Sequence, residues 1–224
     1  MLTLLTATGM RPEAWAICER LMLRQTYDGP VRWIIVDDGE VPQPITFRRQ
    51  GWTLEIIRPL PFWAPGQNTQ ARNLIAGLER VWNDERLVII EDDDHYAPGY
   101  LADVDKWLDT ADLVGEPMAR YFNVETGVGK QLTNNAHCSL CSTAVKGEGI
   151  KALRQAVLKN KKFIDLVLWS QFKGKKFLSK TRHVVGIKGL PGRGGIGAGH
   201  RMAGAKTNGL LRKWIGDDAA IYGY

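Results

Sequence analysis

The sequence contains no apolar run that approaches the roughly 18 residues required for a transmembrane helix. Its N-terminal stretch, "MLTLLTATGMRP", is apolar over only a few residues and has neither a basic leader nor a small-residue cleavage site. We therefore expect this stretch to form a first strand rather than a signal or an anchor, and we expect a cytoplasmic protein.

Cysteine is also scarce. The three cysteines, Cys18, Cys138 and Cys141, are an odd number in a chain without an export signal, which favours reduced thiols over disulfides. Cys138 and Cys141 form the close pair, but a structural zinc site would need two further ligands at matching spacing. We interpret this pair as small buried residues, and a metal or redox role is the alternative.

Acidic residues are almost missing from one long segment. Residues 146–213 contain 17 lysines and arginines but only two acids, Glu148 and Asp165, whereas residues 1–145 contain 13 basic and 20 acidic residues. Such a one-sided charge attracts polyanions, which include nucleic acid, nucleotides and anionic membrane surfaces. The alternatives are that the acidic part of the chain folds across this segment, or that its basic loops simply face solvent.

The chain has 224 residues, 44% of them hydrophobic, and is long enough for one sizeable core, so we expect a single domain over 1–224. Buried-strand and helix patterns alternate through the first half. They predict strands over 2–8, 31–39, 52–60 and 86–94, and helices over 11–25 and 68–83. This order predicts an α/β fold with a doubly wound, mostly parallel sheet, whose ligands bind at the carboxyl ends of the strands.

The second half is less regular. Its patterns predict helices over 100–111 and 148–160, a hairpin over 119–132 that turns at Thr126 and Gly127, and a small-residue strand over 136–145. Residues 186–199 contain seven glycines, which give too much backbone freedom for regular structure. We expect a mobile, basic loop there.

Two acidic clusters follow predicted strands: Asp37 with Asp38, and the run from Glu91 to Asp94. Carboxylates are hard oxygen ligands suited to Mg²⁺ or Mn²⁺, which bind between a few carboxylates and the phosphates of a substrate. Neighbouring side chains of a strand point to opposite faces, so four consecutive carboxylates cannot all enter one site. We expect one or two of them to bind metal. The alternative, an acidic cap for the helix near Pro98, needs only one carboxylate.

Four stretches resemble glycosyltransferases of the GT-A fold, and among these the family-two pattern: "LLTATGMRP", "QTYDGPVRWIIVDDG", "NTQARN" and "VIIEDDDHYAPGYL". The resemblance implies a Rossmann-like central sheet flanked by helices. Residues 1–100 would then hold a nucleotide sugar, most simply a UDP-sugar, and residues 101–224 the acceptor. The residues that the resemblance places around the nucleotide sugar are Thr6, Ala7, Arg11, Asp37, Asp38, Gln67, Arg72 and Asp92.

The acidic run takes the place of the family's DxD motif, and the proline seven residues after its first acid sets the register. In that register Glu91 replaces the commoner aspartate at the first position, and Asp93 stands at the second. The resemblance thus implies Asp93 as the ligand of Mn²⁺ or Mg²⁺, with Asp94 as the next candidate. His200 is the candidate to complete the metal shell, as a histidine does in some relatives, and His183 is its competitor.

In inverting relatives a carboxylate from the second half acts as general base on the acceptor hydroxyl. Asp165 in "FIDLVLW" is the candidate here, and the alternative is that it only pairs with Lys161 or Lys162. The glycine-rich segment 186–199 resembles the lid that closes over the donor diphosphate in many GT-A enzymes. The residues that would supply positive charge to the leaving phosphates are Lys188, Arg193 and Arg201.

The resemblance does not specify the acceptor. A basic second half without a membrane helix favours nucleic acid, held through its phosphates. Small phage enzymes that glycosylate hydroxymethylated pyrimidines in DNA are similar in size and charge, which would place the reaction in the host cytoplasm. Trp169 or Phe172 is the candidate to stack on a displaced base, and core packing is the alternative for Trp169. Two other functions stay open: a glycosyltransferase for a cell-surface glycan or glycolipid, and a non-catalytic nucleic-acid-binding module.

Overall fold

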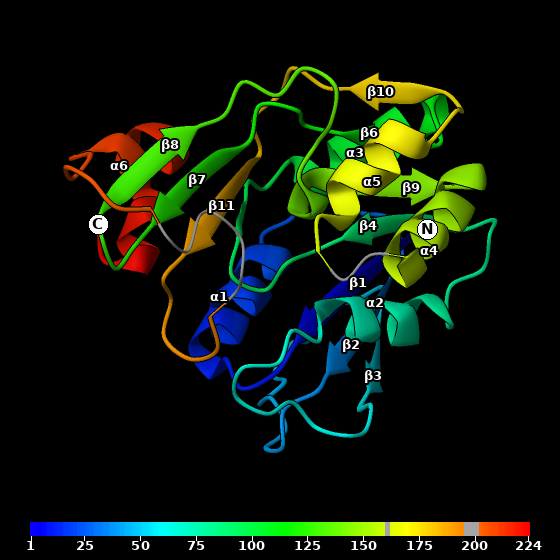
Figure 1. Cartoon of the computed structure of the whole chain (residues 1–224), viewed down its shortest axis with the longest axis horizontal. Helices are drawn as coiled ribbons and strands as arrows, with labels where there is room; N and C mark the ends of the chain where they lie inside the picture. The colour runs from blue at the N-terminus through cyan, green and yellow to red at the C-terminus, as the bar shows by residue number, and fades with distance from the viewer. Residues whose placement is uncertain (160–161, 195–201) are drawn as a thin grey trace.

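The computed structural model describes residues 1–159, 162–194 and 202–224 (Figure 1). The helices are α1 (Pro12–Leu23), α2 (Gln70–Leu78), α3 (Tyr100–Thr110), α4 (Glu148–Lys159), α5 (Ile164–Gln171) and α6 (Leu210–Ile215), with 3-10 helices over Leu140–Ser142 and Gly216–Tyr222. The strands are β1 (Leu2–Thr8), β2 (Val31–Asp37), β3 (Trp52–Ile57), β4 (Arg86–Ile89), β5 (His95–Tyr96), β6 (Leu113–Gly115), β7 (Arg120–Asn123), β8 (Val128–Gln131), β9 (Thr143–Lys146), β10 (Lys176–Leu178) and β11 (Val184–Lys188). Within these described ranges no helix has both the length and the apolarity needed to cross a membrane.

Seven strands form the central sheet, in the order β10-β6-β9-β4-β1-β2-β3. The pairs β1–β2, β2–β3, β1–β4 and β6–β10 are parallel, while β9 runs antiparallel to both of its neighbours. Along β1 and β2 the register pairs Thr8 with Asp37, so these two strands end side by side. The predicted α/β fold with a mostly parallel central sheet is confirmed.

Helices cover both faces of the central sheet (Figure 1). Helices α1 and α3 pack on one face, where Trp15 of α1 and Trp33 of β2 stack with their ring centroids 5.2 Å apart. Helices α2, α4 and α5 cover the other face, around side chains such as Leu5 and Ile34. Because both faces are covered, the central strands are apolar almost without interruption, which is the pattern read from the sequence.

A smaller sheet, in the order β5-β11-β7-β8, lies beside the central one (Figure 1). The predicted hairpin is confirmed as β7 and β8. Strand β11 shows that the glycine-rich segment begins as a buried strand, so the prediction of irregular structure over all of 186–199 is wrong. At Gly186 an added Cβ would lie 2.4 Å from Cδ1 of Tyr121, so this glycine allows β11 and β7 to approach each other. Residues 195–199 lie outside the described part of the chain.

Several predicted elements are shorter than expected, among them a strand of the second half and helix α2. The strand predicted over 136–145 begins only at Thr143. The hydroxyls of Ser142 and Thr143 donate to the backbone carbonyl of Ser139, at 3.2 and 2.8 Å, and these local bonds hold a 3-10 turn in place of strand. Helix α2 ends at Leu78, and a turn leads from there into β4. Neither difference moves the carboxyl ends of the central strands.

The two aromatic residues predicted to stack on a displaced base belong to the core. Trp169 is 1% exposed and Phe172 is 6% exposed. The indole N–H of Trp169 donates to Oγ1 of Thr143 at 3.1 Å, which satisfies its one polar group inside the protein. The stacking prediction is therefore wrong for both residues, and the alternative of core packing is correct for Trp169.

Candidate active site

Both predicted acidic clusters lie at the same edge of the central sheet. Asp38 directly follows β2, and residues 91–94 follow β4, which ends at Ile89. We call residues 91–94 the acidic turn, because they form a turn between β4 and β5 rather than an extension of the strand. The expected alternation of strand side chains therefore does not apply to them. Ligands of such sheets bind at this carboxyl edge.

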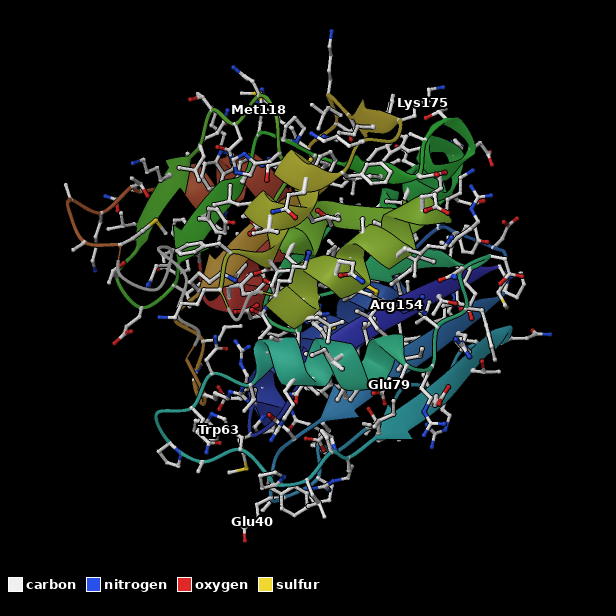
Figure 2. The ribbon with its side chains drawn as sticks, turned by 45° about the vertical axis from the view of Figure 1, so that its right-hand side comes forward. Glu40, Trp63, Glu79, Met118, Arg154 and Lys175 are labelled. Atoms are coloured by element: carbon white, nitrogen blue, oxygen red, sulfur yellow. The ribbon has the colours of Figure 1, made fainter. Side chains whose placement is uncertain are left out.

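Asp38 is fully buried and binds three side chains. Its Oδ1 accepts a hydrogen bond from Nη1 of Arg193 at 2.6 Å, and its Oδ2 accepts one from Nη2 of Arg72 at 2.9 Å. The hydroxyl of Thr69 also donates to Oδ2 and accepts from Nη2 of Arg193 at 2.5 Å. The Arg193 guanidinium lies 4.9 Å from the ring centroid of Trp63, which Figure 2 labels on the loop between β3 and α2. Two arginines predicted to bind the nucleotide sugar thus meet at one carboxylate.

Asp37 and Thr6, two other predicted residues, have partners of their own. The Asp37 carboxylate accepts hydrogen bonds from the backbone N–H groups of Gly39, at 3.0 Å, and Gln43, at 2.9 Å, which closes the turn after β2. The Thr6 hydroxyl is fully buried and accepts a hydrogen bond from the indole of Trp33 at 2.9 Å. The Asp37 side chain therefore stabilises this turn, and the Thr6 side chain belongs to the core. Neither joins the side chains that bind Asp38.

Gln67 holds the loop that carries Trp63. Its side-chain oxygen accepts a hydrogen bond from the backbone N–H of Ala64 at 3.2 Å, and its backbone carbonyl accepts one from the Trp63 indole at 3.0 Å. Gln67 therefore helps to position Trp63, which lies against Arg193, a partner of Asp38. Ala7, also predicted at the nucleotide sugar, is half-buried near the end of β1.

Arg11 joins two acids of the acidic turn to the start of α1. Its Nη1 donates to Asp92 at 2.7 Å and its Nη2 to Asp93 at 2.9 Å. The hydroxyl of Thr8, at the end of β1, also donates to Asp92 at 2.7 Å. Burial alone would lower the pKa of Arg11, but the charges of Asp92 and Asp93 raise it above its usual value. Arg11 and Asp92, both predicted at the nucleotide sugar, are thus partners of each other.

Lys188, the last residue of β11, reaches the acidic turn from the smaller sheet. Its ammonium lies 2.7 Å from Oδ1 of Asp94, 3.2 Å from Oδ2 of Asp93 and 3.8 Å from Oε2 of Glu91. Burial alone would lower the pKa of Lys188, but the charges of Asp93, Asp94 and Glu91 raise it well above its usual value. The ammonium is therefore a permanent positive charge among these acids.

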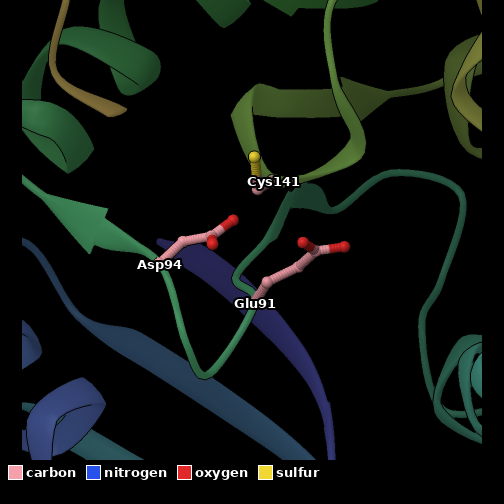
Figure 3. Close-up of side chains that lie close together, drawn as sticks. All are labelled: Glu91, Asp94 and Cys141. Atoms are coloured by element: carbon pink, nitrogen blue, oxygen red, sulfur yellow. The ribbon is translucent and has the colours of Figure 1, made fainter. Parts of the chain in front are cut away.

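The acidic turn also has the chemistry to hold a divalent ion. The ligand atoms of Glu91, Asp94 and Cys141 all lie within 4.8 Å of one another, and Figure 3 shows the three side chains around one space. Oδ2 of Asp94 is buried and has no hydrogen-bond partner among the described residues. Burial raises the pKa of the Cys141 thiol well above its usual value, so the sulfur stays neutral and is a poor ligand for Mg²⁺ or Mn²⁺. The two carboxylates fit such an ion, and the thiol does not.

Comparisons with known proteins bear on the fold. No protein-family model and no curated protein matches the sequence. Among solved structures, S. aureus TarS matches with a TM-score of 0.58 and 12% identity, over 84% of this chain and 37% of TarS. S. aureus TarS 1-349 in complex with UDP-GlcNAc matches with a TM-score of 0.54 and 11% identity, over 92% of this chain and 62% of that one. The chain has the fold of TarS.

A third solved structure is the mannosyltransferase PcManGT from Pyrobaculum calidifontis, in complex with GDP-Man and Mn²⁺. It matches with a TM-score of 0.47 and 14% identity, over 85% of this chain and 57% of that one. The chain therefore spans less than two thirds of the length of each of these three structures. The identities to the two TarS structures show a shared fold and nothing finer.

Not every predicted metal ligand falls within the described residues. Asp93 lies in the acidic turn as expected. His200 lies outside the described residues, as does Arg201, which was predicted at the phosphates. His183, the competing histidine, bonds through Nε2 to the carboxylate of Asp103 on α3 at 2.9 Å. This contact turns the imidazole towards α3.

Asp165, the predicted general base, lies in the first turn of α5. Among the described residues no ion pair holds it, so the predicted alternative of pairing with Lys162 is not seen, and Lys161 lies outside those residues. Burial raises the pKa of both Asp165 and Glu91, and the charge of Asp165 adds to the rise at Glu91. The charge of Asp165 therefore acts on the acidic turn through Glu91.

Several contact residues of the site were not indicated by any sequence pattern. Trp63 lies under Arg193, and Thr69 lies between Arg193 and Asp38. The side-chain amide of Gln70 donates to Oε1 of Glu91 at 3.0 Å. These residues stand in a loop or at a helix start, far in sequence from their partners. The "ARN" stretch beside them was the only signal in their neighbourhood.

Proposed function

We propose that this chain transfers a sugar from a nucleotide sugar to a hydroxyl acceptor. The observation that carries the proposal is the pairing of acids with cations at the carboxyl edge of the sheet, where two arginines hold Asp38 while Arg11 and Lys188 hold the acidic turn. Carboxylates bind ribose hydroxyls and divalent ions, and cations bind a diphosphate. A nucleic-acid-binding module, the non-catalytic alternative, would expose its cations instead of burying them among carboxylates.

A UDP-sugar is the proposed donor. Asp38 would hold the nucleoside beside Trp63, and Arg193, Lys188 and Arg201 would bind the diphosphate. The bond between the anomeric carbon and the diphosphate oxygen breaks, so the leaving UDP gains one negative charge, which needs neutralising. The bound UDP-GlcNAc in TarS, whose fold this chain shares, supports a donor of this class.

Mn²⁺ or Mg²⁺ is the proposed cofactor. Asp94 would hold it through its unpartnered Oδ2, together with Asp93 and Glu91, and His200 is the remaining candidate ligand. The chemistry that such an ion supplies is neutralisation of the charge that develops on the leaving diphosphate. Carboxylate ligands favour these hard ions over softer ones.

Asp165 is the proposed general base. It would accept the proton of the acceptor hydroxyl while the acceptor oxygen forms its bond to the anomeric carbon. A carboxylate whose pKa is raised by burial is a stronger base than a solvated one, which supports this role. No described residue forms an ion pair with Asp165, although the charge of His137 partly offsets the rise in pKa that burial causes.

A hydroxymethylated pyrimidine in DNA is the proposed acceptor. Lys188 and Arg193 of the basic segment fold onto acids, but other cations stay exposed. Those around β10 are Lys173, Lys175, Lys176, Lys180 and Arg182, of which Figure 2 labels Lys175. Exposed cations suit a phosphate backbone. Phe163 is 69% exposed and lies two residues before Asp165 in the chain. It is the proposed residue to stack on a displaced base, in place of the buried Trp169 and Phe172. The reaction is expected in the cytoplasm, that of the host if a phage encodes the protein.

Transfer of labelled sugar should reach hydroxymethylcytosine DNA and leave unmodified DNA and a lipid extract unlabelled. Unmodified DNA is the matched control, because it offers the same phosphates without the accepting hydroxyl. Label in the lipid extract alone would favour the glycan or glycolipid alternative. A chain that neither transfers sugar nor hydrolyses the donor with Mn²⁺ would contradict the enzyme proposal and favour the binding module.

Phe163→Ala is expected to raise the KM for modified DNA by about 5- to 150-fold, because stacking contributes about 1–3 kcal/mol per base. The KM for the donor should not change. Steady-state kinetics with both substrates measure the two effects. Trp82→Ala is the control, since Trp82 is 73% exposed but precedes β4 at the opposite edge of the sheet. Equal KM values for DNA in both variants would show that Phe163 does not stack on the acceptor.

A further inference from the structure

Lys188 occupies the carboxylates that a divalent ion would need. Its ammonium is within 4 Å of three acids of the acidic turn, and only 6% of the residue is exposed. Its shortest contact, 2.7 Å, is to Oδ1 of Asp94, and the backbone N–H of Ile187 also donates to this oxygen at 2.9 Å. Oδ1 is therefore fully used, and Oδ2 is the oxygen of Asp94 that remains for another cation.

An ammonium in this position opposes the binding of a divalent ion. Two cations that share a carboxylate are a few ångströms apart, and at such a distance their repulsion in a protein interior is large. The ammonium also neutralises part of the charge of Asp93 and Glu91, which would otherwise attract the ion. The acidic turn is consequently a weaker metal site while Lys188 points into it.

A bound diphosphate would offer the Lys188 ammonium a second anionic partner. Lys188 ends β11 and is followed by Gly189, whose φ of +81° turns the chain towards Arg193. Arg193 in turn reaches Asp38, so residues 188–193 connect the acidic turn with Asp38, and a diphosphate is proposed to bind there. A four-carbon stem with free rotation lets a lysine move its charge by several ångströms without moving the strand.

We propose that Lys188 competes with the divalent ion for Asp94, Asp93 and Glu91, and that its ammonium moves to the diphosphate of the donor, so that donor and ion favour each other's binding. This inference rests on the proposed function for the identity of the donor. It adds that the acidic turn is a weak metal site without the donor. By linkage, each ligand then raises the affinity for the other by the same factor.

Mn²⁺ affinity, measured by the electron paramagnetic resonance signal of free Mn²⁺, tests the inference with and without UDP. In the natural protein UDP should tighten Mn²⁺ binding by about 5- to 150-fold. Lys188→Met removes the charge and keeps an apolar stem, so without UDP it should bind Mn²⁺ at least about 10-fold more tightly. The further gain from UDP should then shrink. Lys188→Gln is a second variant of the same kind, in case the first does not fold.

Two control variants separate competition from a general change of charge. Lys188→Arg keeps the positive charge and should keep the low Mn²⁺ affinity. Lys106→Met removes one charge from an exposed pair with Asp103 on α3, away from the acidic turn, and should leave Mn²⁺ binding unchanged. Mn²⁺ affinity in Lys188→Met and Lys188→Gln equal to that of the natural protein would overturn the inference if UDP still binds. Failure of the natural protein to bind UDP or any nucleotide sugar would instead overturn the proposed function.

Discussion

Asp165→Asn is expected to slow sugar transfer by about 10²- to 10⁴-fold, the usual contribution of a general base, while UDP binding is retained. Asparagine keeps the shape of the side chain but cannot accept the proton of the acceptor. Burial raises the pKa of Asp165 and the charge of His137 lowers it, but no described residue forms an ion pair with Asp165, so the substitution breaks no ion pair. Single-turnover transfer of labelled sugar and calorimetric titration with UDP measure the two quantities.

The pH dependence of the transfer rate gives a second test of Asp165 as the general base. Burial raises its pKa, so the rate of the natural protein should fall as pH decreases through this raised value, because the base becomes protonated. The sign for stability is opposite. A carboxyl whose pKa is higher in the folded state binds more protons folded than unfolded, so it lowers the free energy of unfolding as pH rises above its ordinary value. Asp165→Asn should therefore be no less stable than the natural protein near neutral pH.

Asp109→Asn is the matched control, because Asp109 is exposed and pairs with Arg86 near the end of α3. It should leave transfer and its pH profile unchanged. Turnover of Asp165→Asn close to that of the natural protein would remove Asp165 from the mechanism, even if the rest of the donor site were correct.

The positions of the acids were predictable because they follow from local sequence. An aliphatic run that stops at a polar residue marks a strand end, and parallel strands end at one edge. Asp38 and the acidic turn are therefore expected at the same edge from the sequence alone. The expectation was wrong on how the acids are presented, because β4 ends at Ile89 and the chain turns at once. Strand length at such a boundary depends on tertiary hydrogen bonds that a local pattern does not contain.

The cations of the site were harder to assign, because their contacts join distant segments. Lys188 meets Asp94 across 94 residues of the chain, and Arg193 meets Asp38 across 155. The sequence showed a basic segment and an acidic one but gave no pairing between them. The composition of 186–199 also misled, since Gly186 serves close packing against a neighbouring strand rather than mobility. Burial of Trp169 likewise depends on a partner, Thr143, that only the fold supplies.

Asp94→Asn is expected to weaken Mn²⁺ binding and to slow transfer by about 10²-fold or more, because a bound metal contributes several kcal/mol to the transition state. Asparagine is a more specific substitution here than alanine, because it removes the charge and keeps a hydrogen bond. An asparagine oxygen still accepts the hydrogen bond from the N–H of Ile187, so the link between the acidic turn and β11 is kept. What is lost is the charge, and the second oxygen is replaced by an amide that cannot bind a cation. Mn²⁺ resonance and labelled transfer measure the two effects.

Asp92→Asn is the informative comparison, because it removes an equal charge from the same turn. Asp92 is already held by Arg11 and Thr8, so its loss should lower the free energy of unfolding, measured by urea, more than it lowers Mn²⁺ affinity. Oδ2 of Asp94 has no hydrogen-bond partner among the described residues. Asp94→Asn should therefore lower Mn²⁺ affinity more than it lowers the free energy of unfolding. If Asp92→Asn lost Mn²⁺ and Asp94→Asn retained it, the metal would belong to the Arg11 side of the turn. Lys188 would then be a structural partner of Asp94, and competition between the two cations would be excluded.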